Sequence, residues 1–150
     1  MLFEDADELF VDKTFNRTRC REFEINYYSH TAGIVGTIAR VFTDYEDELG
    51  YYHAFKAVTD TAQADVNRTA IPWGHTTIPG ENIHRIKAIL VDEHVGQGKG
   101  IRRYFEEQYP PRTSLQHIKA IVKVCQVHYF RTIRKLQTQK KVPEGIIEVV

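Results

Sequence analysis

Cysteine, net charge and long apolar runs are all scarce in this 150-residue chain. The only cysteines, Cys20 and Cys125, cannot build a disulfide framework, so we expect a reduced, intracellular protein. Lys and Arg number 20, as do Asp and Glu, so any nucleic-acid site must be a local feature. No apolar segment reaches transmembrane length, and the acidic start MLFEDADELF lacks the design of a signal peptide.

The chain contains enough apolar sequence for one hydrophobic core. Hydrophobic residues make up 42% and aromatic residues 11%, values typical of a globular domain. A length of 150 residues suits one such domain, and neither internal repeats nor low-complexity tracts divide it. We therefore expect a single domain over residues 1–150.

The first half of the chain predicts an antiparallel meander followed by a helix. Strands are expected over Leu9–Asn16, Arg21–Ser29 and Gly33–Phe42, because each is rich in β-branched or aromatic residues. In the second of these, apolar and polar residues alternate, as in a strand with one buried face. Thr43 or Asp44 can cap a following helix, whose apolar residues recur at helical spacing as far as Ala62.

The second half predicts one buried strand and two helices. Ile86–Val91 is a short apolar run that suits a strand covered on both faces. A helix over His94–Gln108 should end before Pro110-Pro111. Thr113 or Ser114 can then cap one long helix that reaches about Gln139. This order of elements predicts an α/β fold with a mixed sheet flanked by helices.

Asp12 and Asp92 are the candidate catalytic residues. Asp12 lies inside the first predicted strand, where acids are disfavoured. Asp92 ends the buried strand, although it could equally cap the next helix. If the first and fourth strands are neighbours, as in a ribonuclease-H-like sheet, the two carboxylates face each other. Such hard oxygen ligands favour Mg²⁺ or Mn²⁺, and two such ions can promote phosphodiester cleavage.

Three further features have both a functional and a purely structural interpretation. Cys125 and His128 lie three residues apart, on one face of the predicted helix, where an inert core thiol and a partly buried histidine are more frequent than ligands. Without a second Cys/His pair at suitable spacing, we expect no structural zinc. The run Gly96–Gly100 lacks phosphate-loop spacing, so no nucleotide cofactor is expected. Basic side chains could contact DNA phosphates or simply be solvated: Arg17, Arg19, Arg21, Arg131, Arg134 and Lys135.

Taken in order, three motifs resemble the Mutator-like element (MULE) transposases, especially those of fungal type. The first is Asp12-x-Thr14-Phe15. The second is the strand that ends in Asp92, followed by Gly96-Gln97-Gly98-Lys99-Gly100, a helix and Tyr109-Pro110. The third is Cys125-x-x-His128-Tyr129-x-Arg131, and the resemblance spans roughly Glu8–Leu136.

The resemblance implies a ribonuclease-H-like DNA transposase domain, with Asp12 and Asp92 as the first two metal-binding acids. Cys125 and His128 would lie near that centre, and nuclear location, DNA recombination and origin in a transposable element would follow. The family's third acid, a Glu, lies far beyond the Cys-x-x-His block, whereas Glu144 and Glu148 lie close to it. We therefore expect a domain that is incomplete at its C-terminus, with weak or lost Mg²⁺ binding and impaired cleavage.

Two alternatives to a transposase-like enzyme remain. One is a non-catalytic domain of the same fold that binds DNA, a protein partner or a second copy of itself. The other is an unrelated α/β hydrolase that uses His128 or His84 as its base, but neither a nucleophile elbow nor triad spacing supports it.

Overall fold

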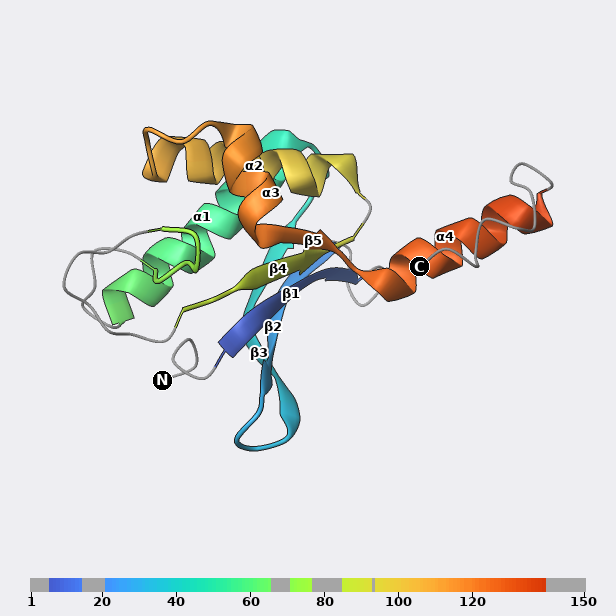
Figure 1. The fold of residues 1–150 in the computed structure, drawn as a ribbon, viewed down its shortest axis with the longest axis horizontal. Coiled ribbons are helices and arrows are strands. Elements are labelled where there is room, and N and C mark those ends of the chain that lie inside the picture. The colour runs from blue at the N-terminus through green and yellow to red at the C-terminus, as the bar shows by residue number, and fades with distance from the viewer. Residues whose placement is uncertain (1–5, 15–20, 66–70, 77–84, 93, 140–150) are drawn as a thin grey trace.

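The computed structural model describes residues 6–14, 21–65, 71–76, 85–92 and 94–139 of the chain. Within these ranges the chain forms a five-stranded mixed sheet and four helices (Figure 1). The elements, in chain order, are β1 (Ala6–Thr14), β2 (Arg21–Ser29), β3 (Ile34–Thr43), α1 (Glu48–Asp65), β4 (Ala88–Val91), α2 (Val95–Gln108), α3 (Ser114–Ile121), β5 (Val122–Val124) and α4 (Gln126–Thr138).

The strands are arranged in the order β3-β2-β1-β4-β5. The first three form the predicted antiparallel meander, and β4 and β5 then add to it in parallel with β1. The expectation that the first and fourth strands are adjacent is confirmed, because Glu8 pairs with Ala88 and Val11 with Val91. The connection from β3 through α1 to β4 therefore crosses from one edge of the meander to the other side of β1.

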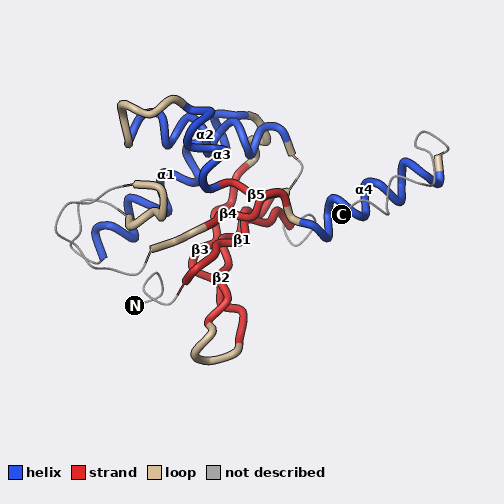
Figure 2. Tube along the Cα trace, in the orientation of Figure 1, coloured by secondary structure: helices blue, strands red, loops and turns tan. Residues whose placement is uncertain are grey.

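The hydrophobic core lies between one face of this sheet and the helices α1, α2 and α3, which Figure 2 shows on the same side of the strands. Side chains alternate between the two faces of each strand, so Leu9, Val11 and Val91 enter this core. Phe55 and Phe105 are fully buried at its centre, and so is Trp73, which lies in the segment between α1 and β4. The opposite face carries the residues between them, including Phe10 and Leu90, and these remain partly exposed.

Helix α1 begins later than its sequence predicts. Thr43 still belongs to β3, where it pairs with Arg21, and so it is not available as a cap. The side chain of Asp47 accepts a hydrogen bond from the Gly50 N–H at 2.8 Å, which satisfies one of the free donors at the helix start. The predicted cap at Thr43 or Asp44 is therefore wrong by three residues or more, because strand pairing extends through Thr43.

The prediction of one long helix from Thr113 to Gln139 is also wrong. Thr113 does cap α3, through a capping box with Gln116. The helix nevertheless ends at Ile121, and the next three residues form β5 beside β4. Two of these three are valines, which fit a strand well, and backbone pairing with β4 outweighs the helical spacing of the apolar residues. Helix α4 then starts afresh and projects away from the sheet (Figure 1).

None of the helices in the described part of the chain is long and apolar enough to cross a membrane.

Candidate metal centre

Asp12 and Asp92 come together at the ends of neighbouring parallel strands. The last residue pair between β1 and β4 is Val11 with Val91, and both valines enter the core. The residues that follow them, Asp12 and Asp92, therefore point to the opposite face of the sheet. A carboxylate oxygen of Asp12 and one of Asp92 lie within 4.8 Å of each other. The juxtaposition expected from the order of the strands is therefore present.

His128 joins the two carboxylates from a third element. It lies in the first turn of α4, and its Nδ1 contacts Oδ1 of Asp92. One potential ligand atom from each of Asp12, Asp92 and His128 can be chosen so that all three lie within 4.8 Å of one another. All three side chains are only partly buried, so an ion could reach them from solvent.

These side chains open into a cavity of about 230 Å³ on the face of the sheet opposite the core. Its walls combine the polar groups with apolar strand residues: Phe10, Val11, Asp12, Asn26, Val35, Leu90, Asp92, Cys125 and His128. Cys125 is therefore a neighbour of His128, as expected, but it occupies the N-cap position of α4 rather than a buried helix face. The interpretation of Cys125 as a core thiol is wrong, because β5 interrupts the predicted helix just before it.

The electrostatics of the site favour a bound cation. Burial raises the pKa of Asp92, and the neighbouring Asp12 carboxyl raises it further, while the His128 ring lowers it. Two carboxylates in contact repel each other unless a proton or a cation lies between them. Two carboxylate oxygens and one imidazole nitrogen form a usual donor set for a divalent ion, so the residues present fit a metal.

Gln97 connects β1 and β4 beside the two aspartates, a role that the sequence analysis did not predict. It lies in the first turn of α2 and is 1% exposed. Its Oε1 accepts a hydrogen bond from the Asp92 N–H at 2.8 Å, and its Nε2 reaches the Val11 carbonyl at 3.5 Å. One buried side chain thus links the backbone next to Asp12 with the backbone of Asp92. The sequence feature that could have indicated this role is a glutamine between two glycines, just after a buried strand.

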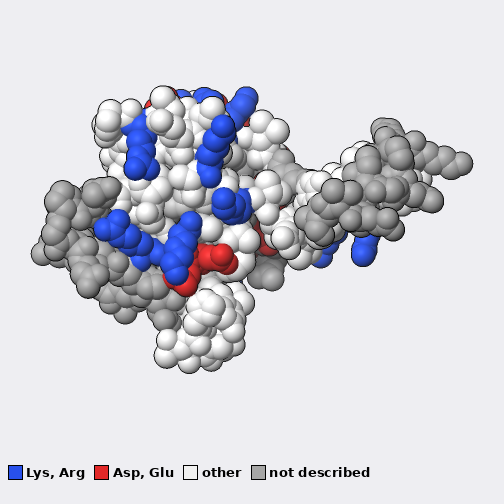
Figure 3. Space-filling model, viewed as in Figure 1, with Lys and Arg blue, Asp and Glu red and all other residues white. Residues whose placement is uncertain are grey.

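Three of the residues predicted to bind DNA are described with their side chains, and all three lie on α4. Arg131, Arg134 and Lys135 are exposed on α4, none of whose residues is buried. Figure 3 shows Lys and Arg side chains spread over one face of the molecule rather than joined in a single patch. Arg17 and Arg19 lie outside the described residues, and for Arg21 the structure describes the backbone in β2 alone.

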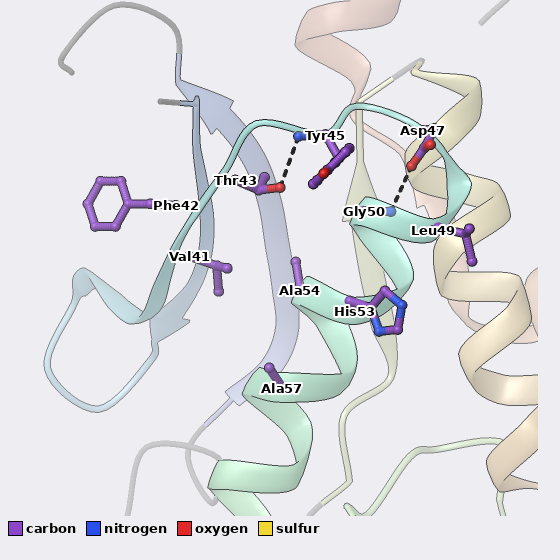
Figure 4. A pocket seen from close by; sticks show the side chains of 10 residues that line it. All are labelled: Val41, Phe42, Thr43, Tyr45, Asp47, Leu49, Gly50, His53, Ala54 and Ala57. Atoms are coloured by element: carbon purple, nitrogen blue, oxygen red, sulfur yellow. Dashed lines mark hydrogen bonds between the residues drawn. The ribbon is translucent and has the colours of Figure 1, made fainter. Parts of the chain in front are cut away.

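A larger cavity, of about 470 Å³, lies between the end of β3 and the start of α1 (Figure 4). It is lined mainly by apolar groups, with Asp47 and His53 at its margin: Val41, Phe42, Thr43, Tyr45, Asp47, Leu49, Gly50, His53, Ala54 and Ala57. The Asp47 carboxylate already caps α1. The smaller cavity, with its converging acids and imidazole, is the better candidate for chemistry.

No protein-family model, curated protein or solved structure matches this chain. The geometry around Asp12, Asp92 and His128 is the feature of this chain that bears on its function.

Proposed function

We propose that this chain is a ribonuclease-H-like domain derived from a MULE-type DNA transposase, with a divalent-metal centre at Asp12 and Asp92. The observation that carries the proposal is the proximity of these aspartates, which follow the last paired residues of the adjacent parallel strands β1 and β4. Phosphodiester cleavage and strand transfer are the ancestral activities, and we expect them to be impaired here.

The order of the elements supports this proposal. An antiparallel meander followed by a crossover helix, a strand parallel to the first and a further parallel strand is the arrangement expected of a ribonuclease-H-like sheet. In open α/β sheets, ligands bind at the carboxyl ends of the strands. Asp92 directly follows β4, and Asp12 lies two residues before the end of β1. The resemblance in the three sequence motifs points to the same class of enzyme.

The chemistry of the site suits a phosphodiester substrate. A bound Mg²⁺ or Mn²⁺ would polarise a phosphoryl oxygen and lower the pKa of a coordinated water. Asp12 and Asp92 would bind the ion, and Gln97 would hold the two strand ends at a fixed separation.

A second candidate function is that of a non-catalytic binding domain on the same fold. The observation that favours it is α4, an amphipathic helix that projects from the body and exposes Arg131, Arg134 and Lys135. Such a helix can contact DNA phosphates, and binding of that kind weakens steeply as salt concentration rises. Its apolar side chains could equally contact a protein partner.

Nicking of supercoiled plasmid DNA in the presence of Mn²⁺ or Mg²⁺ tests the enzyme proposal. We expect slow, metal-dependent nicking that disappears in Asp12→Asn and in Asp92→Asn. Asp60→Asn is the matched control, because Asp60 is an exposed acid paired with Lys56 on α1. Metal binding without nicking would instead favour the non-catalytic domain. Salt-dependent DNA affinity that Asp12→Asn retains but Arg131→Ala/Arg134→Ala loses would identify DNA as its partner.

A further inference from the structure

We infer that His128 is the third protein ligand of this centre and makes it selective for a transition-metal ion, of which Mn²⁺ and Zn²⁺ are examples, over Mg²⁺. The inference rests on the proposed metal centre at Asp12 and Asp92 and specifies which ion that centre takes.

The position of His128 is set by the sheet, as a metal ligand requires. The N–H of Cys125 donates to the Val91 carbonyl at 2.9 Å, which attaches the start of α4 to the end of β4. The Cys125 carbonyl in turn accepts from the Tyr129 N–H at 3.0 Å and closes the first helical turn. His128 lies within that turn, one residue before Tyr129, while Asp92 directly follows Val91. One short segment of backbone therefore fixes the imidazole relative to the carboxylate.

The three donors approach from three separate elements: β1 supplies Asp12, Asp92 follows β4, and α4 supplies His128. A ligand set of this kind surrounds an ion on one side and leaves its other side open to water or substrate, as catalytic metal sites do. Cys125 lines the same cavity but is not part of the group of converging ligand atoms. The group is thus two oxygens and one nitrogen, without sulfur.

The nitrogen donor decides which ion is preferred. Mg²⁺ dehydrates reluctantly, demands octahedral oxygen ligands and gains little from an imidazole. Imidazole suits Zn²⁺ and the later transition ions, and affinities for a given nitrogen-containing site rise from Mn²⁺ to Cu²⁺ and fall again at Zn²⁺. A site made of Asp12 and Asp92 alone would favour Mg²⁺ or Mn²⁺, whereas a site that includes His128 shifts the balance towards the transition metals.

A competing role for His128 is that of a counter-ion, which would pair with Asp92 without touching the metal. Both roles place the ring beside Asp92, as the contact between His128 Nδ1 and Asp92 Oδ1 requires. They differ in one observable, since only direct ligation puts a histidine nitrogen in the first coordination sphere of the ion.

The test is to titrate the full chain with Mn²⁺, Zn²⁺ and Mg²⁺ by calorimetry and to record the nitrogen couplings of bound Mn²⁺ by pulsed electron paramagnetic resonance. The variants are His128→Ala, Asp12→Asn with Asp92→Asn, and His53→Ala as the matched control, since His53 is an exposed histidine on α1. Circular dichroism of each variant verifies that the fold is retained.

We expect the parent chain and His53→Ala to bind Mn²⁺ and Zn²⁺ more tightly than Mg²⁺, with a nitrogen coupling on Mn²⁺. His128→Ala should abolish that coupling and weaken Mn²⁺ and Zn²⁺ by more than the roughly 10–100-fold that loss of an outer-shell partner costs. The role of His128 as ligand is refuted if the parent chain shows no nitrogen coupling and His128→Ala keeps the ion preference. The carboxylate centre still stands in that case, provided that Asp12→Asn with Asp92→Asn abolishes binding. Failure of the parent chain to bind any of the three ions would refute both.

Discussion

Replacing Gln97 by methionine tests how the metal centre is held together. The substitution keeps the length and volume of the side chain but removes both of its polar atoms. The Asp92 N–H would then lose its acceptor at 2.8 Å, in a position where Gln97 itself is 1% exposed. The bond to the Val11 carbonyl, at 3.5 Å, is at the outer limit of hydrogen bonding and contributes little.

The expected loss of stability follows from that single strong bond. A buried donor left without a partner costs about 1–3 kcal/mol. For a domain of this size, each kcal/mol lowers the melting temperature by roughly 2–4 °C, so Gln97→Met should lower it by about 2–12 °C. Since the same bond holds the backbone of Asp92 beside that of Asp12, we also expect Mn²⁺ affinity to fall by about tenfold or more, as for other outer-shell partners.

Urea denaturation and calorimetric titration with Mn²⁺ measure the two effects separately. Gln108→Met is the matched control, because Gln108 ends the same helix, is exposed and bonds weakly to Glu107. Unchanged stability and unchanged Mn²⁺ affinity in Gln97→Met would refute the positioning role. A loss of stability without a loss of affinity would mean that Gln97 supports the fold but does not set the separation of the acids.

Two further predictions concern the packing and the pH dependence of the fold. Gly100→Ala should destabilise the chain by about 1–3 kcal/mol in urea denaturation, because its Cβ would lie 2.6 Å from the backbone nitrogen of Tyr52 where α2 meets α1. Gly98→Ala on the same helix, with nothing within 4 Å, should instead stabilise it by about 0.5–1 kcal/mol, and equal effects of the two would contradict this packing. Burial, and then the adjacent His117, lower the pKa of His75 from 6.5 to about 4, so folding favours its neutral form and stability should fall as pH drops from 6.5 towards 4. With solvent screening of this half-buried ring we expect a loss of about 1–2 kcal/mol in that window, which should largely disappear in His75→Phe.

The meander, the presence of α1, the span of α2 and the cap at Thr113 could be predicted from the sequence, because they depend on local patterns. Alternation of apolar residues in β2 marks its buried face, and Pro110-Pro111 marks the end of α2. The proximity of Asp12 and Asp92 could also be predicted, since the order of elements favours a sheet in which β1 and β4 are adjacent.

What the sequence could not predict depends on contacts between distant segments. The run from Val122 to Val124 has helical spacing on either side, and only the free edge of β4 makes it a strand. That strand ends one helix and begins another, which moves Cys125 to a helix start and brings His128 against Asp92. The sequence by itself thus determined most of the local elements and indicated Asp12 and Asp92 as candidate metal ligands. Backbone pairing between segments far apart in the chain decided how His128 and Gln97 are placed at the site, because the free energy of such pairing belongs to both segments and is encoded in neither alone.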